Sequence, residues 1–307
     1  MAIENMRIGN HTLEMGNLDK VIFPDIGLTQ GGLLRYYRKI SAVMLPHLKD
    51  RPLTLQRFPD GIDADGFYQK KIPDYFPGWI TTAEIDVKEK RGSQHQVVCN
   101  TEAALAYLVD QGCITFHIWQ SRKDKLEHPD RMIFDLDPAG EDFGPVREGA
   151  FRLRKLLEKI GLSPFVMTTG SRGLHVVVPL QRRYDFDTVR QFARNVAETL
   201  ADRDPDRFTT EMSKKKRKGR LFLDYLRNSY GQNSVAPYAV RAKPGAPVAT
   251  PIEWDELKSS NLHSQTYTVQ NILRRMGQKQ DPWQDIGDKK YSIKKAEEKL
   301  TGLTDDD

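Results

Sequence analysis

The stretch Arg131-Met132-Ile133-Phe134-Asp135-Leu136-Asp137-Pro138 places two carboxylates two residues apart at the end of an apolar run. Because successive side chains of a strand point to opposite faces, Asp135 and Asp137 share one face while Leu136 points into the core. Two like charges this close repel each other and raise each other's pKa unless a cation lies between them. Their hard oxygen ligands suit Mg²⁺ or Mn²⁺. The alternative is a strand that ends in a solvated acidic turn, with Pro138 stopping the ladder.

The composition bounds the class of protein. The 307 residues, 38% hydrophobic and 29% charged, suffice for one large domain or two smaller ones. No apolar stretch approaches membrane-spanning length and residues 1–5 lack a signal-peptide pattern, so we expect no membrane association and a cytoplasmic location. Only Cys99 and Cys113 are present, which argues against a disulfide framework or a thiolate zinc site. The net charge of +5 permits a polyanionic partner without requiring one.

The densest basic block is Ser213-Lys214-Lys215-Lys216-Arg217-Lys218-Gly219-Arg220. A run of like charges usually marks a solvated loop. The apolar segment that follows, residues 221–226, is typical of a buried strand and contains Asp224. An ionised Asp inside an apolar strand is costly unless it is paired or binds a metal, so Asp224 is a candidate third metal ligand.

The remaining pattern alternates helices and strands. Periodicity predicts helices at residues 29–47, 101–109, 145–160 and 187–200, and strands at residues 114–118, 164–169 and 174–179. Thr29 is a candidate N-cap, and Gly161 follows the third helix as a stop signal. The tail from Lys289 to Asp307 is charged and poor in apolar residues, so we expect a frayed helix or disorder there.

A second motif is Thr168-Thr169-Gly170-Ser171-Arg172-Gly173-Leu174-His175. Glycines let backbone amides approach an anion closely, and hydroxyls and Arg172 can bind phosphate oxygens. A glycine-rich hairpin tip with an incidental histidine is the alternative interpretation. The order of the motifs along the chain favours a functional site: a carboxylate pair, a helix, a phosphate-type turn, a basic loop and a third carboxylate. That order is typical of a two-metal nucleotidyl-transfer site.

Further motifs extend over nearly the whole chain. They are Asn17-Leu18-Asp19-Lys20-Val21-Ile22-Phe23-Pro24, Arg51-Pro52-Leu53-Thr54-Leu55-Gln56-Arg57-Phe58-Pro59-Asp60-Gly61, Gly66-Phe67-Tyr68-Gln69-Lys70, His117-Ile118-Trp119, Asp224-Tyr225-Leu226-Arg227-Asn228 and Ala236-Pro237-Tyr238-Ala239-Val240-Arg241. With them the sequence resembles the polymerase domain of the bacterial and archaeal DNA end-joining ligases, the ligase D type, a branch of the archaeo-eukaryotic primase superfamily. No ligase or nuclease motifs accompany them, so the resemblance is to the stand-alone form or an excised domain.

The resemblance implies an α+β fold: a primase-type catalytic core of mainly antiparallel strands with flanking helices, plus a smaller N-terminal α/β portion. We expect one catalytic domain over residues 1–290, with the N-terminal portion to about residue 110 and the core over about residues 111–290. A charged tail at residues 291–307 would follow.

The resemblance also implies roles for individual residues. Asp135, Asp137 and Asp224 would hold two divalent cations, Mn²⁺ or Mg²⁺. Residues expected to bind or line the incoming nucleotide are His117, Thr169, Arg172, His175 and Arg241, and those expected to bind DNA are Lys20, Arg57, Phe67, Tyr68, Lys214, Lys215 and Lys216. Interleaved aromatic and cationic side chains suit a sequence-tolerant nucleic-acid surface, although core packing is the alternative for the two aromatics.

Three positions depart from the family pattern. Thr169 stands where serine is usual, and Arg172 stands where lysine is common; both keep the chemistry. Gln30 stands where a second lysine often joins Lys20 in reading a 5′-phosphate, so the charge of that pocket is weaker.

The implied function is template-directed nucleotidyl transfer that fills gaps and extends ends during non-homologous end joining, with NTPs or dNTPs as substrates. Gapped or broken DNA, a Ku-like protein and a DNA ligase are the implied partners. Two alternatives remain. Residues 133–137 also resemble the opening motif of haloacid dehalogenase-type phosphatases, although Gly-Thr does not follow and 130 residues precede Arg131. A non-catalytic DNA-end binding module is the other.

Overall fold

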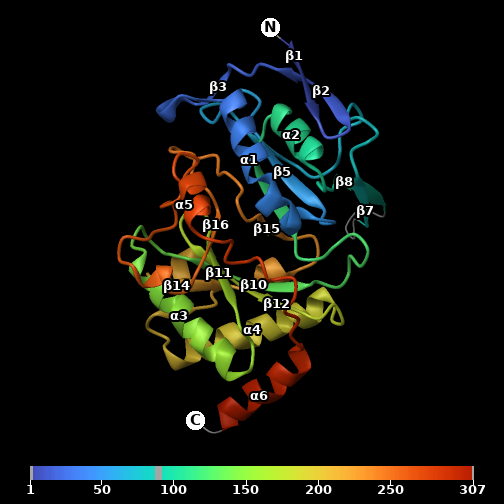
Figure 1. Cartoon of the computed structure of the whole chain (residues 1–307). Helices are drawn as coiled ribbons and strands as arrows, with labels where there is room; N and C mark the ends of the chain where they lie inside the picture. Colours follow the sequence, from blue (N-terminus) through green and yellow to red (C-terminus); the bar gives the residue numbers. More distant parts are fainter. Residues whose placement is uncertain (1–2, 87–91, 306–307) are drawn as a thin grey trace. The chain divides into compact units, whose positions relative to one another are not determined.

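The computed structural model describes residues 3–86 and 92–305 of a mixed α+β chain, shown in Figure 1. Two compact units are distinguished. The first comprises Met1–Asp124, Asn233–Ala249 and Tyr267–Lys279, and the second comprises Lys125–Gln232, Thr250–Thr266 and Gln280–Asp307. This division differs from the boundary expected near residue 110, because two late segments of the chain return to the first unit.

The first unit is built, in its described part, on an antiparallel sheet with the strand order β15-β9-β5-β6. These strands are β15 (Asn233–Val235), β9 (Cys113–Trp119), β5 (Leu53–Arg57) and β6 (Phe67–Gln69). Hairpins join β1 (Ile3–Ile8) to β2 (His11–Gly16), β3 (Val21–Phe23) to β4 (Leu28–Thr29), and β7 (Thr82–Asp86) to β8 (Ser93–Val97). A 3-10 turn, η1 (Pro24–Ile26), separates β3 from β4.

The helices of the first unit begin where side-chain caps predict. Helix α1 (Gln30–Leu48) starts after Thr29, whose hydroxyl accepts the amide of Gly32 at 3.1 Å. Thr101 caps α2 (Glu102–Asp110) in the same way. A shorter helix, α5 (Ile272–Gln278), completes the unit.

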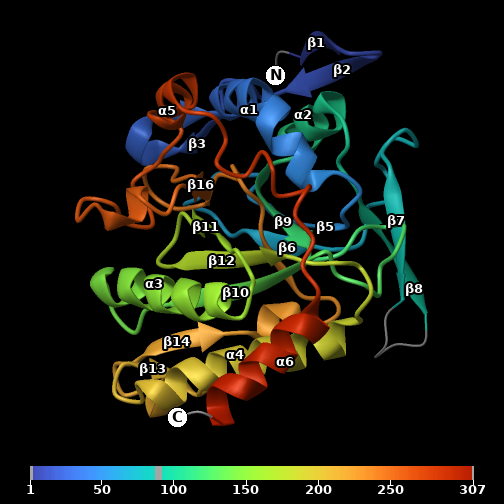
Figure 2. The same cartoon turned by 60° about the horizontal axis from the view of Figure 1, so that its bottom comes forward.

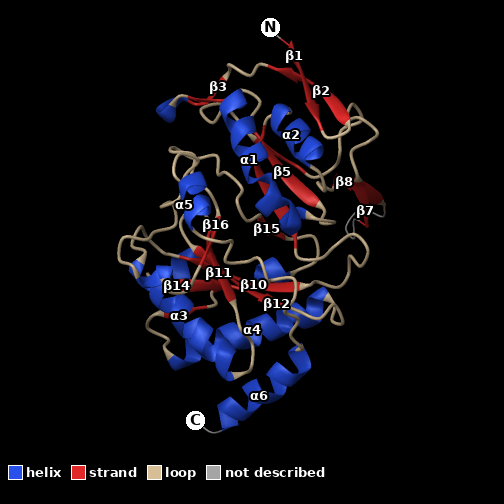
Figure 3. Ribbon diagram, in the orientation of Figure 1, coloured by secondary structure: helices blue, strands red, loops and turns tan. Residues whose placement is uncertain are grey.

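The second unit is built on a sheet whose described strands follow the order β13-β14-β10-β12-β11-β16. They are β13 (Phe208–Thr209), β14 (Leu221–Asp224), β10 (Arg131–Asp137), β12 (Leu174–Pro179), β11 (Phe165–Thr168) and β16 (Thr250–Ile252). Neighbours pair antiparallel except β13 with β14. The strand that carries Asp135 and Asp137 therefore lies inside this sheet (Figure 3).

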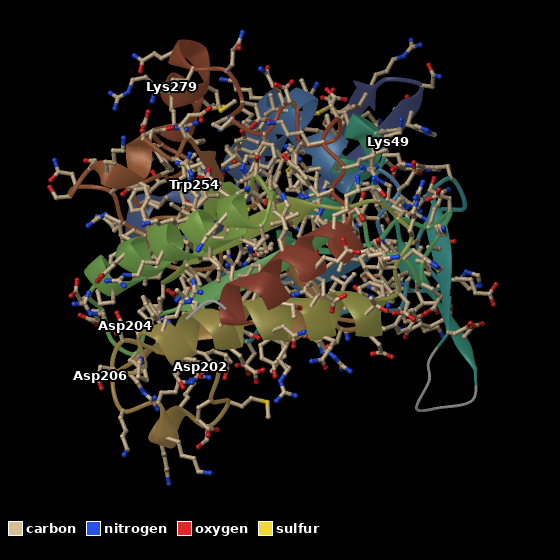
Figure 4. All side chains as sticks on the ribbon, turned by 90° about the horizontal axis from the view of Figure 1, so that it is seen from below. Lys49, Asp202, Asp204, Asp206, Trp254 and Lys279 are labelled. Atoms are coloured by element: carbon tan, nitrogen blue, oxygen red, sulfur yellow. The ribbon has the colours of Figure 1, made fainter. Side chains whose placement is uncertain are left out.

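Helices α3 (Gly144–Lys159) and α4 (Phe186–Arg203) pack against this sheet. The 3-10 turn η2 (Lys214–Lys216) lies between β13 and β14, η3 (Leu226–Asn228) follows β14, and η4 (Glu256–Lys258) follows β16. Trp254 fixes one end of α3: its indole donates to the carbonyl of Pro164 at 2.9 Å, and its ring lies 4.9 Å from the guanidinium carbon of Arg154 (Figure 4). Asp204, at the end of α4, binds Arg152 at 3.2 Å.

The charged tail contains an ordered helix, which corrects the expectation of fraying or disorder. Helix α6 (Ile293–Asp305) lies along α4 (Figure 2) and buries Ile293, Ala296 and Leu300. These residues recur every three to four positions, so a narrow apolar stripe suffices to hold a helix that is otherwise charged. Within residues 3–86 and 92–305, no helix combines the length and apolar character needed to cross a bilayer.

Candidate active site

The register of the central strands brings acidic side chains together in the second unit. Asp135 on β10 pairs directly with Asp224 on β14 and with His175 on β12. Asp137 lies two residues further along β10, on the same face as Asp135. The side chains of Asp135, Asp137 and Asp224 are 17%, 28% and 16% exposed. Three carboxylates thus share one largely buried face of the sheet.

Cationic side chains balance these carboxylates. A single nitrogen of Arg172, Nη2, donates to both carboxylate oxygens of Asp137, at 2.8 Å and 2.9 Å. Arg227 bridges the other two: its Nε lies 3.4 Å from Asp135 Oδ2 and 3.8 Å from Asp224 Oδ2. His175 Nε2 lies 3.7 Å from Asp135 Oδ1. Each carboxylate therefore has a counter-charge or a charge-assisted donor beside it.

The pKa values of two carboxyl groups move in opposite directions. Burial by itself raises the pKa of Asp135, but the adjacent His175 and Arg227 outweigh burial and hold that pKa below its ordinary value. Burial and the negative charge of Asp135 raise the pKa of Asp224, and its bond from the Leu226 amide and the nearby Arg227 and Arg217 offset this only in part. The two carboxyl groups of the pair therefore differ: the pKa of Asp135 is lowered and that of Asp224 is raised.

The donor set fits a divalent cation. Among the residues that the structure describes, no three His, Cys, Asp or Glu side chains stand close enough to ligate one ion as they are. Arg172 and Arg227 engage carboxylate oxygens that an ion would bind. Both arginine side chains are partly exposed, at 51% and 40%, and can turn toward solvent. Oxygen-only ligands of this kind suit Mg²⁺ or Mn²⁺.

The turn between β11 and β12 is closed by short polar contacts within itself and with Ser264. The Thr169 hydroxyl lies 3.1 Å from the carbonyl of Gly173 and 3.1 Å from the hydroxyl of Ser264, and it accepts the amide of Ser171 at 3.3 Å. Thr169 is buried, at 5% exposed, so in this state it shapes the turn. Ser264 was not identified from the sequence, because it lies 91 residues beyond Gly173, whose carbonyl it binds at 2.9 Å.

The basic block divides into exposed and buried charges. Lys214, Lys215 and Lys216 form the turn η2 and point to solvent. Arg217 is instead 9% exposed: its guanidinium stacks 3.7 Å from the Phe222 ring and donates to the carbonyls of Glu211 and Met212 at 3.0 Å each. Its Nη1 lies 3.9 Å from Asp137 Oδ2. Arg217 therefore links this loop to the carboxylate face, a role that its charge alone did not reveal.

The predicted DNA-binding aromatics lie in the first unit and are exposed, Phe67 at 46% and Tyr68 at 62%. Core packing is therefore excluded for both. Tyr68 also contacts His117 of β9, with ring centroids 5.7 Å apart. Arg57 lies behind Phe67, 5.4 Å from its ring centre.

Two of the cations expected to bind DNA, Arg57 and Lys20, are engaged by groups of the protein itself. Arg57 is 7% exposed and donates to the Gln111 carbonyl at 2.7 Å and to the Tyr75 hydroxyl at 2.9 Å. Lys20 binds Asp60 and the carbonyl of Pro59, each at 2.6 Å. Arg57 thus helps to position two exposed aromatic side chains, Phe67 and Tyr75.

Gln30 is buried as well, and its amide donates to the backbone carbonyls of Asp110 at 3.0 Å and Gly16 at 3.3 Å. It joins β2 to α2. Arg241, the remaining predicted nucleotide ligand, is half-buried in the first unit after the bridge between Val240 and Val248. The predicted site residues are thus distributed over both units, with the carboxylates, His175, Thr169 and Arg172 gathered in the second.

Comparisons with known proteins identify the family of the chain. Residues 29–283 match the family described as LigD, primase-polymerase domain. The multifunctional non-homologous end joining protein LigD of Pseudomonas aeruginosa is 33% identical over 287 residues, which cover 92% of this chain and 34% of that protein. The bifunctional protein LigD of Bacillus subtilis is 31% identical over 277 residues, 89% of this chain and 44% of that protein.

A solved structure gives the same result. The polymerase domain from Mycobacterium tuberculosis ligase D in complex with DNA superposes with a TM-score of 0.85 at 29% sequence identity, covering 91% of this chain and 99% of that one. The chain belongs to the LigD primase-polymerase domain family. It spans about a third to less than half of the length of these two relatives. The phosphatase and the non-catalytic alternatives find no support.

The close approach of the turn to β10 makes Gly173 a sharp test of the site. A Cβ on Gly173 would stand 2.0 Å from the Leu136 carbonyl oxygen, so the backbone must shift. Gly173→Ala should lower the free energy of unfolding by about 3 kcal/mol in urea titrations. Gly140→Ala, whose Cβ meets no atom within 4 Å, is the control. Equal stability of the two variants would show that the turn does not press on β10.

Proposed function

We propose that this chain is a template-directed nucleotidyltransferase, a polymerase with primase-like activity that fills gaps and extends broken DNA ends in non-homologous end joining. The observation that carries the proposal is the shared face of Asp135, Asp137 and Asp224 in the sheet of a LigD primase-polymerase fold. Carboxylates arranged in this way are the ligands that two-metal phosphoryl transfer requires.

In the proposed mechanism, Asp135, Asp137 and Asp224 would hold two divalent cations, Mn²⁺ or Mg²⁺, which would activate the primer 3′-hydroxyl and neutralise the triphosphate. His175 would keep Asp135 ionised and oriented, because it lies against one carboxylate oxygen. Arg172 would change partners. If Asp137 held a cation, the Arg172 guanidinium would be available to bind phosphate oxygens of the nucleotide, which its planar shape matches.

Binding of DNA would use exposed groups of both units. Phe67 and Tyr68 offer ring faces on which template bases can stack, a contact that tolerates any sequence. Lys214, Lys215 and Lys216 offer charges for backbone phosphates. His117 and Arg241 of the first unit would bind the incoming nucleotide, and Lys20 would contact DNA by exchanging Asp60 for a phosphate. A Ku-like protein and a DNA ligase are the proposed partners, in the cytoplasm.

The carboxylates provide the first test. Asp135→Ala, Asp137→Ala and Asp224→Ala should each abolish extension of a primer in a gapped duplex with Mn²⁺, because each removes a proposed metal ligand. The affinity of each variant for the same DNA should stay within a few-fold of that of the unmodified chain, since phosphate contacts carry most of the affinity. Glu141→Ala, an exposed carboxylate in the loop after β10, is the matched control and should extend normally. Substantial extension by any of the three variants would remove the proposed centre.

The exposed lysines provide the second test. Replacing Lys214, Lys215 and Lys216 by Gln should weaken DNA binding and make it less dependent on salt, because each lost phosphate contact releases about one counterion fewer. The control replaces Lys155, Lys159 and Lys294, exposed lysines of helices α3 and α6, with the same change of net charge. Fluorescence anisotropy over a range of salt concentrations measures both slopes. Identical salt dependences for the two triple variants would show that the lysines of the loop do not contact DNA phosphates.

The sugar preference provides the third test. Similarity to primases leads us to expect ribonucleoside triphosphates to be used at least as well as deoxyribonucleoside triphosphates. A site that pairs with a 2′-hydroxyl leaves polar groups unsatisfied when it is missing, at a cost of about 1–3 kcal/mol. Single-nucleotide insertion opposite each template base, with both sugars under one metal, measures the ratio. A deoxynucleotide preference above about tenfold would contradict a primase-like pocket.

A further inference from the structure

A cavity of about 410 Å³ lies in the second unit, at the end of β12 beside α6. Its volume falls within the range of small-molecule sites. Four cationic side chains line it together with hydroxyl, amide and aromatic groups: Arg183, Lys290, Lys295 and Lys299, with Gln181, Tyr291 and Ser292 among the others. Among the described residues, no Asp or Glu lines the cavity.

The cavity is separate from the carboxylate face. Along β12 the chain passes from His175, beside Asp135, to Gln181 at the cavity, a path of six residues or about 20 Å in extended conformation. The backbone there is held firmly: the amide of Gln181 donates to the carbonyl of Tyr291 at 2.9 Å, and the amide of Tyr291 donates to Pro179 at 3.1 Å. These bonds fix one wall of the cavity.

The first turn of α6 also lines the cavity and is anchored as well. The hydroxyl of Tyr184 lies 3.0 Å from that of Ser292 and accepts the amide of Lys294 at 3.3 Å. Lys295 and Lys299 are one helical turn apart and line the cavity from the same side of α6. The lysines therefore project from an ordered helix.

The four cations lack acidic partners. In the described part of the chain none of them lies within 4.0 Å of a carboxylate oxygen. Glu158 of α3, the nearest acid in sequence to the Gly161 wall, is paired with Arg154 at 2.7 Å, and Glu297 and Glu298 of α6 do not line the cavity. Lys299 lies against Gly161 at the end of α3, where carbonyl groups offset part of its charge. Arg183, Lys290 and Lys295 remain without such an offset.

We propose that this cavity binds a compact polyphosphate anion, either free or as the phosphate tail of a nucleotide. Converging cations without counter-charges repel one another, and a multivalent anion removes that repulsion while accepting their hydrogen bonds. The N-terminal end of α6 also favours an anion, because a helix carries partial positive charge there. Tyr291 supplies a ring face for a base if the anion is a nucleotide. The cavity would thus be a second phosphate site, distinct from the one used for nucleotidyl transfer.

The test compares two double variants of the whole chain that change net charge equally. Lys290→Gln with Lys295→Gln removes two cations that line the cavity, and Lys289→Gln with Lys294→Gln removes their sequence neighbours, which do not line it. Calorimetric titration with inorganic tripolyphosphate, in EDTA so that no metal assists the catalytic face, measures affinity. A parallel titration uses ATP.

We expect at least tenfold weaker tripolyphosphate binding for the cavity variant and less than a twofold change for the neighbour variant. Tighter binding of ATP than of tripolyphosphate, lost on Tyr291→Ala, identifies a nucleotide; equal binding identifies phosphate recognition alone. Equal affinities of the two double variants, or no saturable binding by the unmodified chain, would overturn the proposal. Primer extension by the cavity variant at the rate of the unmodified chain shows that its fold is intact, independently of these titrations.

Discussion

Charge balance on one face of a sheet is the constraint on which the site depends. Antiparallel register sets Asp135 beside Asp224, and strand alternation adds Asp137. Such a group cannot be buried without compensation, because each carboxylate loses solvation and repels the others. Arg172, Arg227 and His175 provide that compensation in the protein alone. In the proposed function, divalent cations would take the place of the arginines beside these carboxylates, Arg172 would turn to nucleotide phosphates, and His175 would stay beside Asp135.

The surrounding structure serves to hold that face in place. Gly173 brings the β11–β12 turn against Leu136, and Thr169 and Ser264 close the turn with hydroxyl contacts. Arg217, stacked on Phe222, ties the basic loop to the same strands. The loop can therefore present exposed lysines to a polyanion while its base stays ordered. In the first unit the buried Arg57 acts similarly, since it lies against the ring of the exposed Phe67 and supports it.

The sequence predicted the parts that depend on local periodicity. Alternation identified the shared face of Asp135 and Asp137, and the Thr29 cap and the main helices follow from short-range patterns. It did not predict which cation meets which carboxylate, because pairs such as Arg172 with Asp137 are set by strand register across 35 residues. Nor did it separate the buried Arg217 from its exposed neighbours, or show that Gln30 joins β2 to α2. The apolar residues of α6, Ile293, Ala296 and Leu300, have helical spacing, but the many charged residues around them favoured a frayed or disordered tail as the prediction.

The central claim is that the carboxylate face binds divalent cations in place of its arginines. Electron paramagnetic resonance of free Mn²⁺, titrated into the protein without DNA or nucleotide, measures this directly. The account predicts saturable binding that is lost when Asp135 and Asp224 are both replaced by Asn, and that tightens in Arg227→Gln, where the competing guanidinium is gone. Equal Mn²⁺ binding by the unmodified chain and the double Asn variant would contradict it.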